Sequence, residues 1–544
     1  MSSYKTSRRD FMKSAGIATI SLATGSANGS MASGQKKRLK KALKVSKNAK
    51  ARKIVFIMTD TQRWDMVGCY GNKNMKTPHL DKLADEGIRF DRAYTCSPVC
   101  GPARSAIFTG TYPHSNGVWG NNMPLGNNVK TIGQRLNDNG YHTAYVGKWH
   151  LDGFDYFDTG ICPDGWDEKY WYCEKKYLLE LSDEDKYRSR QDSTNNDPDL
   201  KADFTFGHRV ANRAVEFLEN HNEEDFFLVA SFDEPHHPWL CPEPYSSMYK
   251  DYVWPKTPNV YDDLKDKPAL QKLWSEKSPR VDKNKLEIKN TFFWGSNSFI
   301  DYEIGRVISK INEVAPDALV IYTSDHGDMQ WTHGISNCKG PVPYDENSRV
   351  PFIVRWPGHS PAGTVTENPV SHINIVPTLL EAAGLEVPGI IEGPSILKTL
   401  EDTSVKPNEA VFTEYGRYEV NHDGFGAFQP MRVIFDGRYK LCINLFDMDE
   451  MYDMQEDEYE MKNLINSEKH AKLRNKLHDS LLDWMNQTRD PFRGQYWSCR
   501  PWRTDMKPSW KDRGFTRPRP DDGYLPRVSD YDTGLLVTEF VRKK

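Results

Sequence analysis

The sequence predicts an α/β protein: a large, mainly parallel sheet flanked by helices, followed by a smaller C-terminal α+β domain with an antiparallel sheet. Three observations support this prediction. Apolar runs of strand length alternate with helical segments up to about residue 400, and several of these runs end at a polar residue. Beyond that point, short strands follow one another directly.

The predicted strands of the large sheet are continuous apolar runs, which is typical of strands buried on both faces. The first run, 53–60, ends in Asp60, and later strands cover 141–146, 226–232 and 318–324. The helices between them begin at a capping residue or a proline and end near a glycine. They cover residues 77–87, 131–139 and 298–314.

Four polar residues lie at or just after the ends of these strands: Asp60, Lys148, His236 and Asp325. In open parallel sheets, ligands bind outside the carboxyl ends of the strands. We therefore expect these four side chains to gather at one edge of the sheet and to form a shared site.

The C-terminal part has a different pattern. Short strands are predicted at 411–415, 431–435 and 438–444, with an Asp436-Gly437 turn that makes the last two a hairpin, and a helix follows at 467–485. We place the catalytic domain at 53–405, the α+β subdomain at 406–490 and an Arg-, Trp- and Pro-rich tail at 491–544.

The tail has two interpretations. Its tryptophans alternate with arginines, which suits a platform where indoles stack on sugar rings and guanidinium groups bind sulfate. Alternatively, the tryptophans pin the tail to the core. The residues concerned are Trp497, Trp502, Trp510, Arg493, Arg500 and Arg503.

Composition limits the class of protein. The chain has 544 residues, of which 38% are hydrophobic and 27% charged, as in soluble globular proteins. A net charge of −4 gives no indication of a nucleic-acid partner. Nine cysteines leave at least one outside any disulfide pairing, and no C-x-x-C pair suggests a zinc site.

The N-terminus predicts export. Residues 7–13, Ser-Arg-Arg-Asp-Phe-Met-Lys, resemble a twin-arginine motif, and the apolar stretch 14–25 is too short to span a bilayer. We expect residues 1–34 to be an export signal for the twin-arginine translocase, without stable membrane insertion, and the protein to be periplasmic or secreted. Residues 35–52 form a basic linker.

The segment around Cys100 carries the chemistry. In Cys100-Gly101-Pro102-Ala103-Arg104, the proline suits the first turn of a helix, and Arg104 lies about one turn beyond the cysteine. The helix N-terminus then favours an anionic ligand beside the thiol. The competing interpretation is a structural cysteine buried before a helix.

This segment, continued to Gly110, resembles the signature of the type I sulfatases, which belong to the alkaline phosphatase superfamily and oxidise this cysteine to formylglycine. Similar motifs occur in the expected order over roughly residues 50–490. They are Thr59 to Arg63, Gly147 to His150, Pro235 to Pro238, Thr323 to Asp328, and Lys339 followed by Tyr344 and Arg349-Val350-Pro351. The resemblance implies an alkaline-phosphatase-like fold and maturation by a formylglycine-generating or anaerobic sulfatase-maturating enzyme.

The resemblance also implies a metal site. Asp60, Asp325, His326 and the oxygen of modified Cys100 would hold one divalent cation. Oxygen-rich ligands favour Ca²⁺ over zinc, with Mg²⁺ or Mn²⁺ as alternatives. The competing interpretation of each acid is a helix cap. Thr61 stands where many sulfatases have a second acid, and Asn374 also replaces a usual acid.

The family's catalytic roles extend to six residues. Cys100 would be the nucleophile once modified, and Arg104 would orient it. Lys148 and Lys339 would hold sulfate oxygens. One of His150 and His236 would protonate the leaving oxygen, and the other would help to release sulfate. In Pro-His-His-Pro the family pattern selects His236 over His237.

The predicted function is hydrolysis of sulfate esters on an exported sulfated carbohydrate, with algal glycans placed ahead of glycosaminoglycans. One alternative is a phosphonate monoester or phosphodiester hydrolase with the same aldehyde and metal. The other is a non-catalytic protein that binds sulfated glycans and keeps Cys100 unoxidised.

Overall fold

The computed structural model describes residues 50–153, 157–336, 339–419, 428–504 and 506. The predicted export signal, most of the basic linker and the tail beyond 506 lie outside these residues. The described residues all belong to one compact unit. Within the described segments, no helix has the length and apolar character needed to cross a bilayer.

Within the part of the chain that the structure describes, the large sheet has seven strands, and four consecutive ones are parallel. The edge beyond them is mixed, because β7 runs antiparallel to both of its neighbours. In spatial order the strands are β4 (His142–Gly147), β5 (Phe226–Ser231), β1 (Lys53–Thr59), β6 (Leu319–Ser324), β7 (Phe352–Arg355), β2 (Ile88–Phe90) and β8 (Thr364–Thr366).

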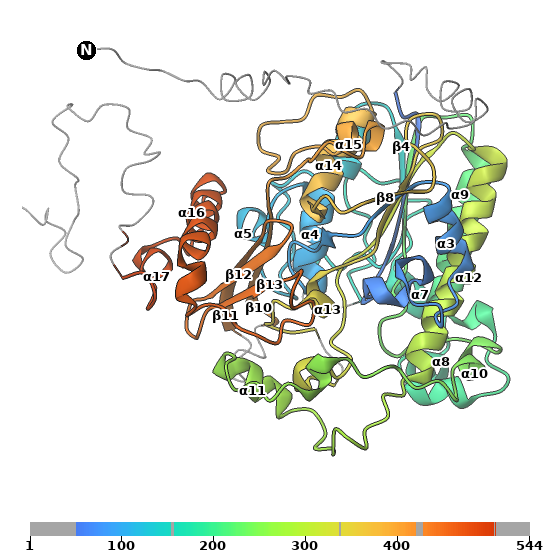
Figure 1. Cartoon of the computed structure of the whole chain (residues 1–544). Coiled ribbons are helices and arrows are strands. Elements are labelled where there is room, and N and C mark those ends of the chain that lie inside the picture. Colours follow the sequence, from blue (N-terminus) through green and yellow to red (C-terminus); the bar gives the residue numbers. More distant parts are fainter. Residues whose placement is uncertain (1–49, 154–156, 337–338, 420–427, 505, 507–544) are drawn as a thin grey trace, which may run out of the picture. The chain divides into compact units, whose positions relative to one another are not determined.

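Helices cover both faces of this sheet (Figure 1). On one face, Phe56 of β1 packs in a core shared with α4 (Cys100–Thr109), α6 (Ile132–Asn137) and α14 (Ile375–Ala382). On the other face, its neighbour Ile57 packs in a core shared with three different helices. They are α3 (Pro78–Asp85), α9 (Phe206–Asn220) and α12 (Thr291–Val314). Successive strand residues point to opposite faces, so an unbroken apolar run was needed here.

The C-terminal part is an antiparallel sheet of four strands with one long helix. Its elements are β10 (Val411–Arg417), β11 (Phe428–Phe435), β12 (Tyr439–Asn444), β13 (Glu450–Asp453) and α16 (Ala471–Gln487). Leu441 of β12 and Leu481 of α16 share a core with Ala106 of α4. The predicted fold class is therefore confirmed.

The remaining α-helices and strands among the described residues are short, and none of them was predicted. They are α5 (Pro113–Asn116), α7 (Glu174–Leu179), α8 (Asp183–Arg188), α10 (Tyr245–Met248), α11 (Ala269–Ser275), α13 (Asp345–Ser348), α15 (Leu397–Glu401), α17 (Gln495–Ser498), β3 (Ala93–Tyr94) and β9 (Val370–Ser371). Such segments are too short for a hydrophobic period to define them.

The described start of the tail packs on the C-terminal sheet. Trp497 is 1% exposed and lies in the core with α16. Arg500 donates to both carboxylate oxygens of Asp449, at 2.8 Å each, and Trp502 Nε1 donates to the same carboxylate at 2.8 Å. For these residues the pinned-tail interpretation holds, whereas Trp510 lies outside the described residues.

Candidate active site

The register of the parallel strands sets the position of the site. Thr59 pairs with Ser324, and Gly147 pairs with Ser231, so β1, β6, β4 and β5 end at the same edge. Asp60, Asp325 and Lys148 come directly after three of these strands. The expected gathering of polar side chains at the carboxyl edge is therefore present.

Helix α4 brings Cys100 to this edge. Cys100 is its first residue, and Pro102 lies in its first turn, where a missing N–H costs no helical hydrogen bond. The backbone N–H of Gly101 donates to Oδ1 of Asn121 at 2.9 Å. Cys100 is 1% exposed, and burial together with the Asp60 carboxylate raises the pKa of its thiol to about 12.

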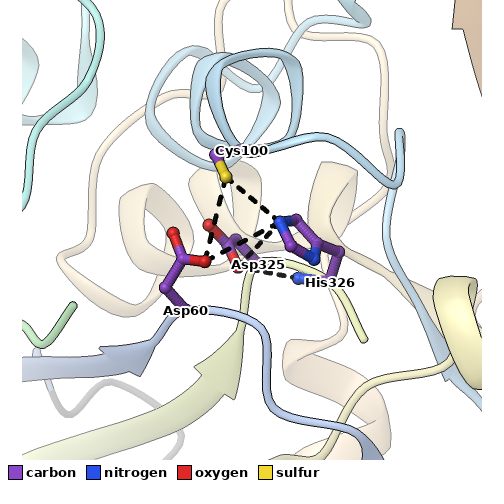
Figure 2. A group of neighbouring side chains, drawn as sticks. All are labelled: Asp60, Cys100, Asp325 and His326. Carbon is purple, nitrogen blue, oxygen red and sulfur yellow. Dashed lines mark hydrogen bonds and ion pairs between the residues drawn. The ribbon is translucent and has the colours of Figure 1, made fainter. Parts of the chain in front are cut away.

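Four side chains predicted as metal ligands converge in front of this helix (Figure 2). Sγ of Cys100 lies 3.2 Å from Nε2 of His326 and 3.8 Å from Oδ1 of Asp60. His326 Nε2 is also 3.8 Å from Oδ1 of Asp60 and 3.7 Å from Oδ1 of Asp325. All four side chains are buried, and their ligand atoms lie within 4.8 Å of one another.

The donor set fits a divalent cation. Nδ1 of His326 lies 2.9 Å from the Gly327 carbonyl, so Nδ1–H donates there and Nε2 presents its lone pair to the cluster. Burial and the Lys339 charge lower the pKa of His326 well below its usual value, which keeps the ring neutral. Sγ of Cys100 marks where an oxygen of formylglycine would lie.

Arg104 donates hydrogen bonds to the Oδ2 atoms of both metal-site carboxylates. Its Nε donates to Oδ2 of Asp325 at 3.0 Å, and Nη2 donates to Oδ2 of Asp60 at 3.1 Å. Nη1 donates to the Lys148 carbonyl and to Oγ of Ser231. The Oδ1 atoms of the two acids therefore remain directed toward His326, so Arg104 orients the acids.

Two lysines flank the cluster. Nζ of Lys148 lies 2.8 Å from Oδ2 of Asp60 and 2.9 Å from Oδ1 of Asp233. Nζ of Lys339 lies 2.7 Å from Sγ of Cys100. Both lysines are buried. Burial raises the pKa of Asp60, but the surrounding positive groups, Lys148 foremost, together outweigh burial and lower that pKa well below its usual value. Burial and the Asp60 carboxylate raise the pKa of Asp325 to about 7.

The two candidate histidines are neutral at pH 7. Burial and the Lys148 charge lower the pKa of His150 well below its usual value, and its backbone N–H donates to Oδ1 of Asp158 at 2.8 Å. Burial and the charges of Lys148 and Lys339 lower the pKa of the half-buried His236 to about 3. His237 is exposed instead, with its ring 4.8 Å from that of Trp239.

Sequence reasoning missed Asp233, whose carboxylate contacts Lys148. The available signal was an acid two residues beyond the end of a buried strand, the same signal that selected Asp60. Thr61 fills part of the space of the missing second acid: its Oγ1 donates to Oδ1 of Asp60 at 2.6 Å. Asn374 accepts from the Ser371 backbone and donates to the Pro394 carbonyl.

The described cysteines are all free thiols. Cys338, next to Lys339 in the sequence, lies outside the described residues. Cys100 is therefore not held in a disulfide with any described cysteine.

Comparison with known proteins identifies the class. The sulfatase family model matches residues 52–385, and a model for the C-terminal part of N-sulphoglucosamine sulphohydrolase matches residues 340–487. The chain belongs to the sulfatase family. It is accordingly a sulfatase enzyme. This result excludes the alternative of a non-catalytic protein that binds sulfated glycans.

Individual relatives agree with this assignment. The chain is 45% identical over 492 residues to the uncharacterized sulfatase YidJ of Escherichia coli K12, covering 89% of this chain and 96% of that one. It is 25% identical to an N-acetylglucosamine-6-O-sulfatase of Bacteroides thetaiotaomicron, with 80% and 87% covered. The structure of BT4656 in complex with its substrate D-glucosamine-2-N,6-O-disulfate shares the fold, with a TM-score of 0.65, 24% identity, and 81% and 98% covered.

Proposed function

We propose that this sulfatase releases inorganic sulfate from a sulfated carbohydrate, with Cys100 oxidised to formylglycine and one divalent cation bound beside it. The observation that carries this proposal is the convergence of Cys100, Asp60, Asp325 and His326 at the carboxyl edge of the sheet. The modification would be made by a formylglycine-generating or an anaerobic sulfatase-maturating enzyme.

Asp60, Asp325, His326 and residue 100 would hold the cation, and we propose Ca²⁺ ahead of Mg²⁺ or Mn²⁺ because carboxylate oxygens predominate. When bound, the cation supplies Lewis-acid stabilisation of charge on sulfate oxygens. Formylglycine supplies, as its hydrate, a hydroxyl nucleophile at the position of Cys100.

The charges of the surrounding residues suit an anionic ester. Arg104, Lys148 and Lys339 are balanced by the carboxylates of Asp60, Asp325 and Asp233. A divalent cation therefore leaves the site with an excess of positive charge. Lys148 and Lys339 lie on either side of the cluster, where each can bind one sulfate oxygen as a point charge.

The proton steps fall to histidine. His236 is half-buried, and we assign to it the proton transfer to the departing sugar oxygen. Burial and the charges of Lys148 and Lys339 lower its pKa in the free site, so it would carry that proton only when the bound anionic ester offsets those charges. His150 is buried and neutral, and we assign to it the acceptance of a proton from the modified residue. This division of roles is our proposal for the alternative that the sequence leaves open.

The substrate proposal rests on the relatives. Both the C-terminal family model and the Bacteroides relative carry names that refer to sulfated glucosamine. Sulfated amino sugars therefore take first place in a substrate panel, ahead of the algal glycans favoured by the sequence. We further propose export through the twin-arginine pathway, which an Arg8→Lys/Arg9→Lys variant should block.

The decisive experiment measures sulfate released from a panel of sulfated amino sugars, glycosaminoglycan fragments and algal oligosaccharides. We expect turnover by the wild type and by the control Cys69→Ala, and a loss of at least about 10³-fold in Cys100→Ala. Mass spectrometry of the peptide containing residue 100 should find an aldehyde. An unmodified thiol in fully active protein would contradict the proposal.

One observation favours a second candidate. Thr61 stands beside Asp60 where the family resemblance leads us to expect a second acid, and its hydroxyl donates to Oδ1 of Asp60. The resemblance extends to phosphonate monoester and phosphodiester hydrolases that use the same aldehyde and metal. Comparing kcat/KM for an aryl sulfate with that for an aryl phosphodiester separates the two. A higher value for the phosphodiester would favour the second candidate.

A further inference from the structure

A second cluster of ligand-type side chains lies at the end of the sheet opposite Cys100. His142 begins β4, His221 follows the last residue of α9, and Glu224 lies in the turn before β5. Nδ1 of His142 is 2.8 Å from Oε2 of Glu224, and Nδ1 of His221 is 3.2 Å from Oε1. One ligand atom from each residue lies within 4.8 Å of the others.

The backbone holds these three residues in place. β4 and β5 are parallel neighbours with His142 opposite Phe226, and the His142 N–H donates to the Asp225 carbonyl at 2.8 Å. The Glu224 N–H donates to the His221 carbonyl at 3.2 Å, which closes the turn. Their convergence is thus fixed by strand pairing and a tight turn.

Nε2 of each ring, the nitrogen that is not in contact with Glu224, also contacts a polar group. Nε2 of His142 lies 2.6 Å from Oδ2 of Asp167, and Nε2 of His221 lies 3.1 Å from the hydroxyl of Tyr170. Asp167 and Glu224 are carboxylates that only accept, and they contact the two ring nitrogens of His142, so a neutral His142 that donates from Nε2 to Asp167 turns its Nδ1 lone pair toward Glu224. That contact needs a cation, either a proton or a metal ion, between the two groups. The Tyr170 hydroxyl accepts from Lys169 and Asn220 and can donate to Nε2 of His221, so it is compatible with either tautomer of that ring.

We propose that His142, His221 and Glu224 bind one zinc ion, with Asp167 holding the His142 ring in the ligating tautomer. Histidine nitrogen and carboxylate oxygen are usual zinc ligands, and a carboxylate behind a ligating histidine is the common outer contact. Tetrahedral zinc with bonds of about 2.0 Å sets neighbouring ligand atoms about 3.3 Å apart. Nδ1 of His221 lies 3.2 Å from Oε1 of Glu224, whereas Nδ1 of His142 lies 2.8 Å from Oε2 and would move outward by a few tenths of an ångström when zinc binds.

The site is open to solvent and separate from the catalytic centre. The Glu224 side chain is 51% exposed, so water can complete the coordination. His142 and Lys148 lie at opposite ends of β4, which spans about 20 Å. Zinc would connect α9, β4, the turn before β5 and the segment carrying Asp167. It would stabilise this end of the sheet without contact with substrate.

The test is calorimetric titration of Zn²⁺ into the full chain, in the wild type and in an Asp325→Asn background that removes a catalytic ligand. We expect one zinc per chain in the Asp325→Asn protein. His221→Ala and Glu224→Gln should weaken binding at least about 100-fold, and Asp167→Asn about 10- to 100-fold. His470→Ala, at a histidine bonded only to Ser467 among the described contacts, should bind as its parent.

Thermal unfolding gives a second readout. Zinc should raise the midpoint of unfolding in the parent and in His470→Ala, and should leave it unchanged in Glu224→Gln, whose exposed side chain is not needed for folding. Absence of zinc uptake in the Asp325→Asn protein, or equal uptake by Glu224→Gln, would overturn the proposal. The cluster would then be a charged histidine held between two carboxylates.

Discussion

Nζ of Lys339 lies 2.7 Å from Sγ of Cys100, although 239 residues separate the two in the chain. The contact places a buried positive charge directly beside the position of the nucleophile. Lys339 arrives there from the segment before α13, and Cys100 arrives from the first turn of α4. The catalytic arrangement therefore depends on how these two distant segments pack.

Replacement of Lys339 by alanine should remove a charge that binds sulfate oxygens most strongly as the ester breaks. We expect kcat/KM for an aryl sulfate to fall by about 10²–10³-fold, in the range measured for losing one oxyanion-stabilising donor. Lys285→Ala, at a lysine whose side chain is 87% exposed, is the control. Equal activities of the two variants would rule out this role.

Replacement of Asp233 by asparagine should misplace Lys148. The carboxylate lies 2.9 Å from Nζ of Lys148 and shares it with Asp60. We expect a fall in kcat of about tenfold with most of the loss recovered in Asp233→Glu, because the longer acid can still reach the ammonium. Asp225→Asn, at the other end of β5, should leave kcat unchanged. An unchanged kcat in Asp233→Asn would contradict the prediction.

Removal of the metal should abolish turnover reversibly. Dialysis against a chelator should leave protein that is folded by circular dichroism and has lost more than about 99% of its activity, because charge on the sulfate is no longer stabilised. Added Ca²⁺ should restore wild-type activity and should not restore Asp325→Asn. Full activity in protein shown to be metal-free by elemental analysis would exclude a catalytic cation.

Acid should weaken the attachment of the tail through His478. Nε2–H of this buried ring donates to the Trp497 carbonyl at 2.8 Å, and Nδ1 accepts from Arg503 at 3.2 Å, so the bonds need a neutral ring. Burial lowers the pKa of His478 to about 4. The unfolded chain, with a pKa near 6.5, therefore binds the proton first as the pH falls.

The stability contributed by His478 is thus complete above about pH 6.5 and is lost toward pH 4, by up to about 3 kcal/mol. Denaturant unfolding at pH 7.5 and pH 5 measures this loss. His478→Gln keeps a donor and an acceptor without titrating, so its stability should fall less between the two pH values. His470→Gln should behave as the wild type, and a parallel fall in all three proteins would refute the assignment.

Truncation of Trp497 should destabilise the fold without altering substrate binding. Its side chain is 1% exposed in the core beside α16, so Trp497→Ala should cost about 3–5 kcal/mol of unfolding free energy. The neighbouring Tyr496 is 81% exposed, and Tyr496→Ala should change stability by less than about 0.5 kcal/mol. A raised KM with unchanged stability in Trp497→Ala would restore the carbohydrate-platform interpretation.

Hydrophobic pattern predicted several of the long, buried elements. The observed strands Lys53–Thr59 and Leu319–Ser324 lie within the predicted runs 53–60 and 318–324, because continuous apolar runs are typical of strands buried on both faces. The 15-residue helix α9, which also has a buried apolar face, was not predicted. The pattern failed for helices of four to six residues such as α7 and α10, which tertiary contacts hold. It also gave no hint that β7 runs antiparallel, since strand direction depends on the path of the chain.

The sequence by itself determined which residue types follow each buried strand, and so placed Asp60, Lys148 and Asp325 at one edge. It could do so because the end of a strand is a local property of the chain, and strands that alternate with helices normally pair in parallel. Only the tertiary structure decided that Arg104 binds the outer oxygens of both acids, that Asp233 shares Lys148, and that Trp497 is core. Those relationships come from the packing of distant segments, which no local pattern encodes.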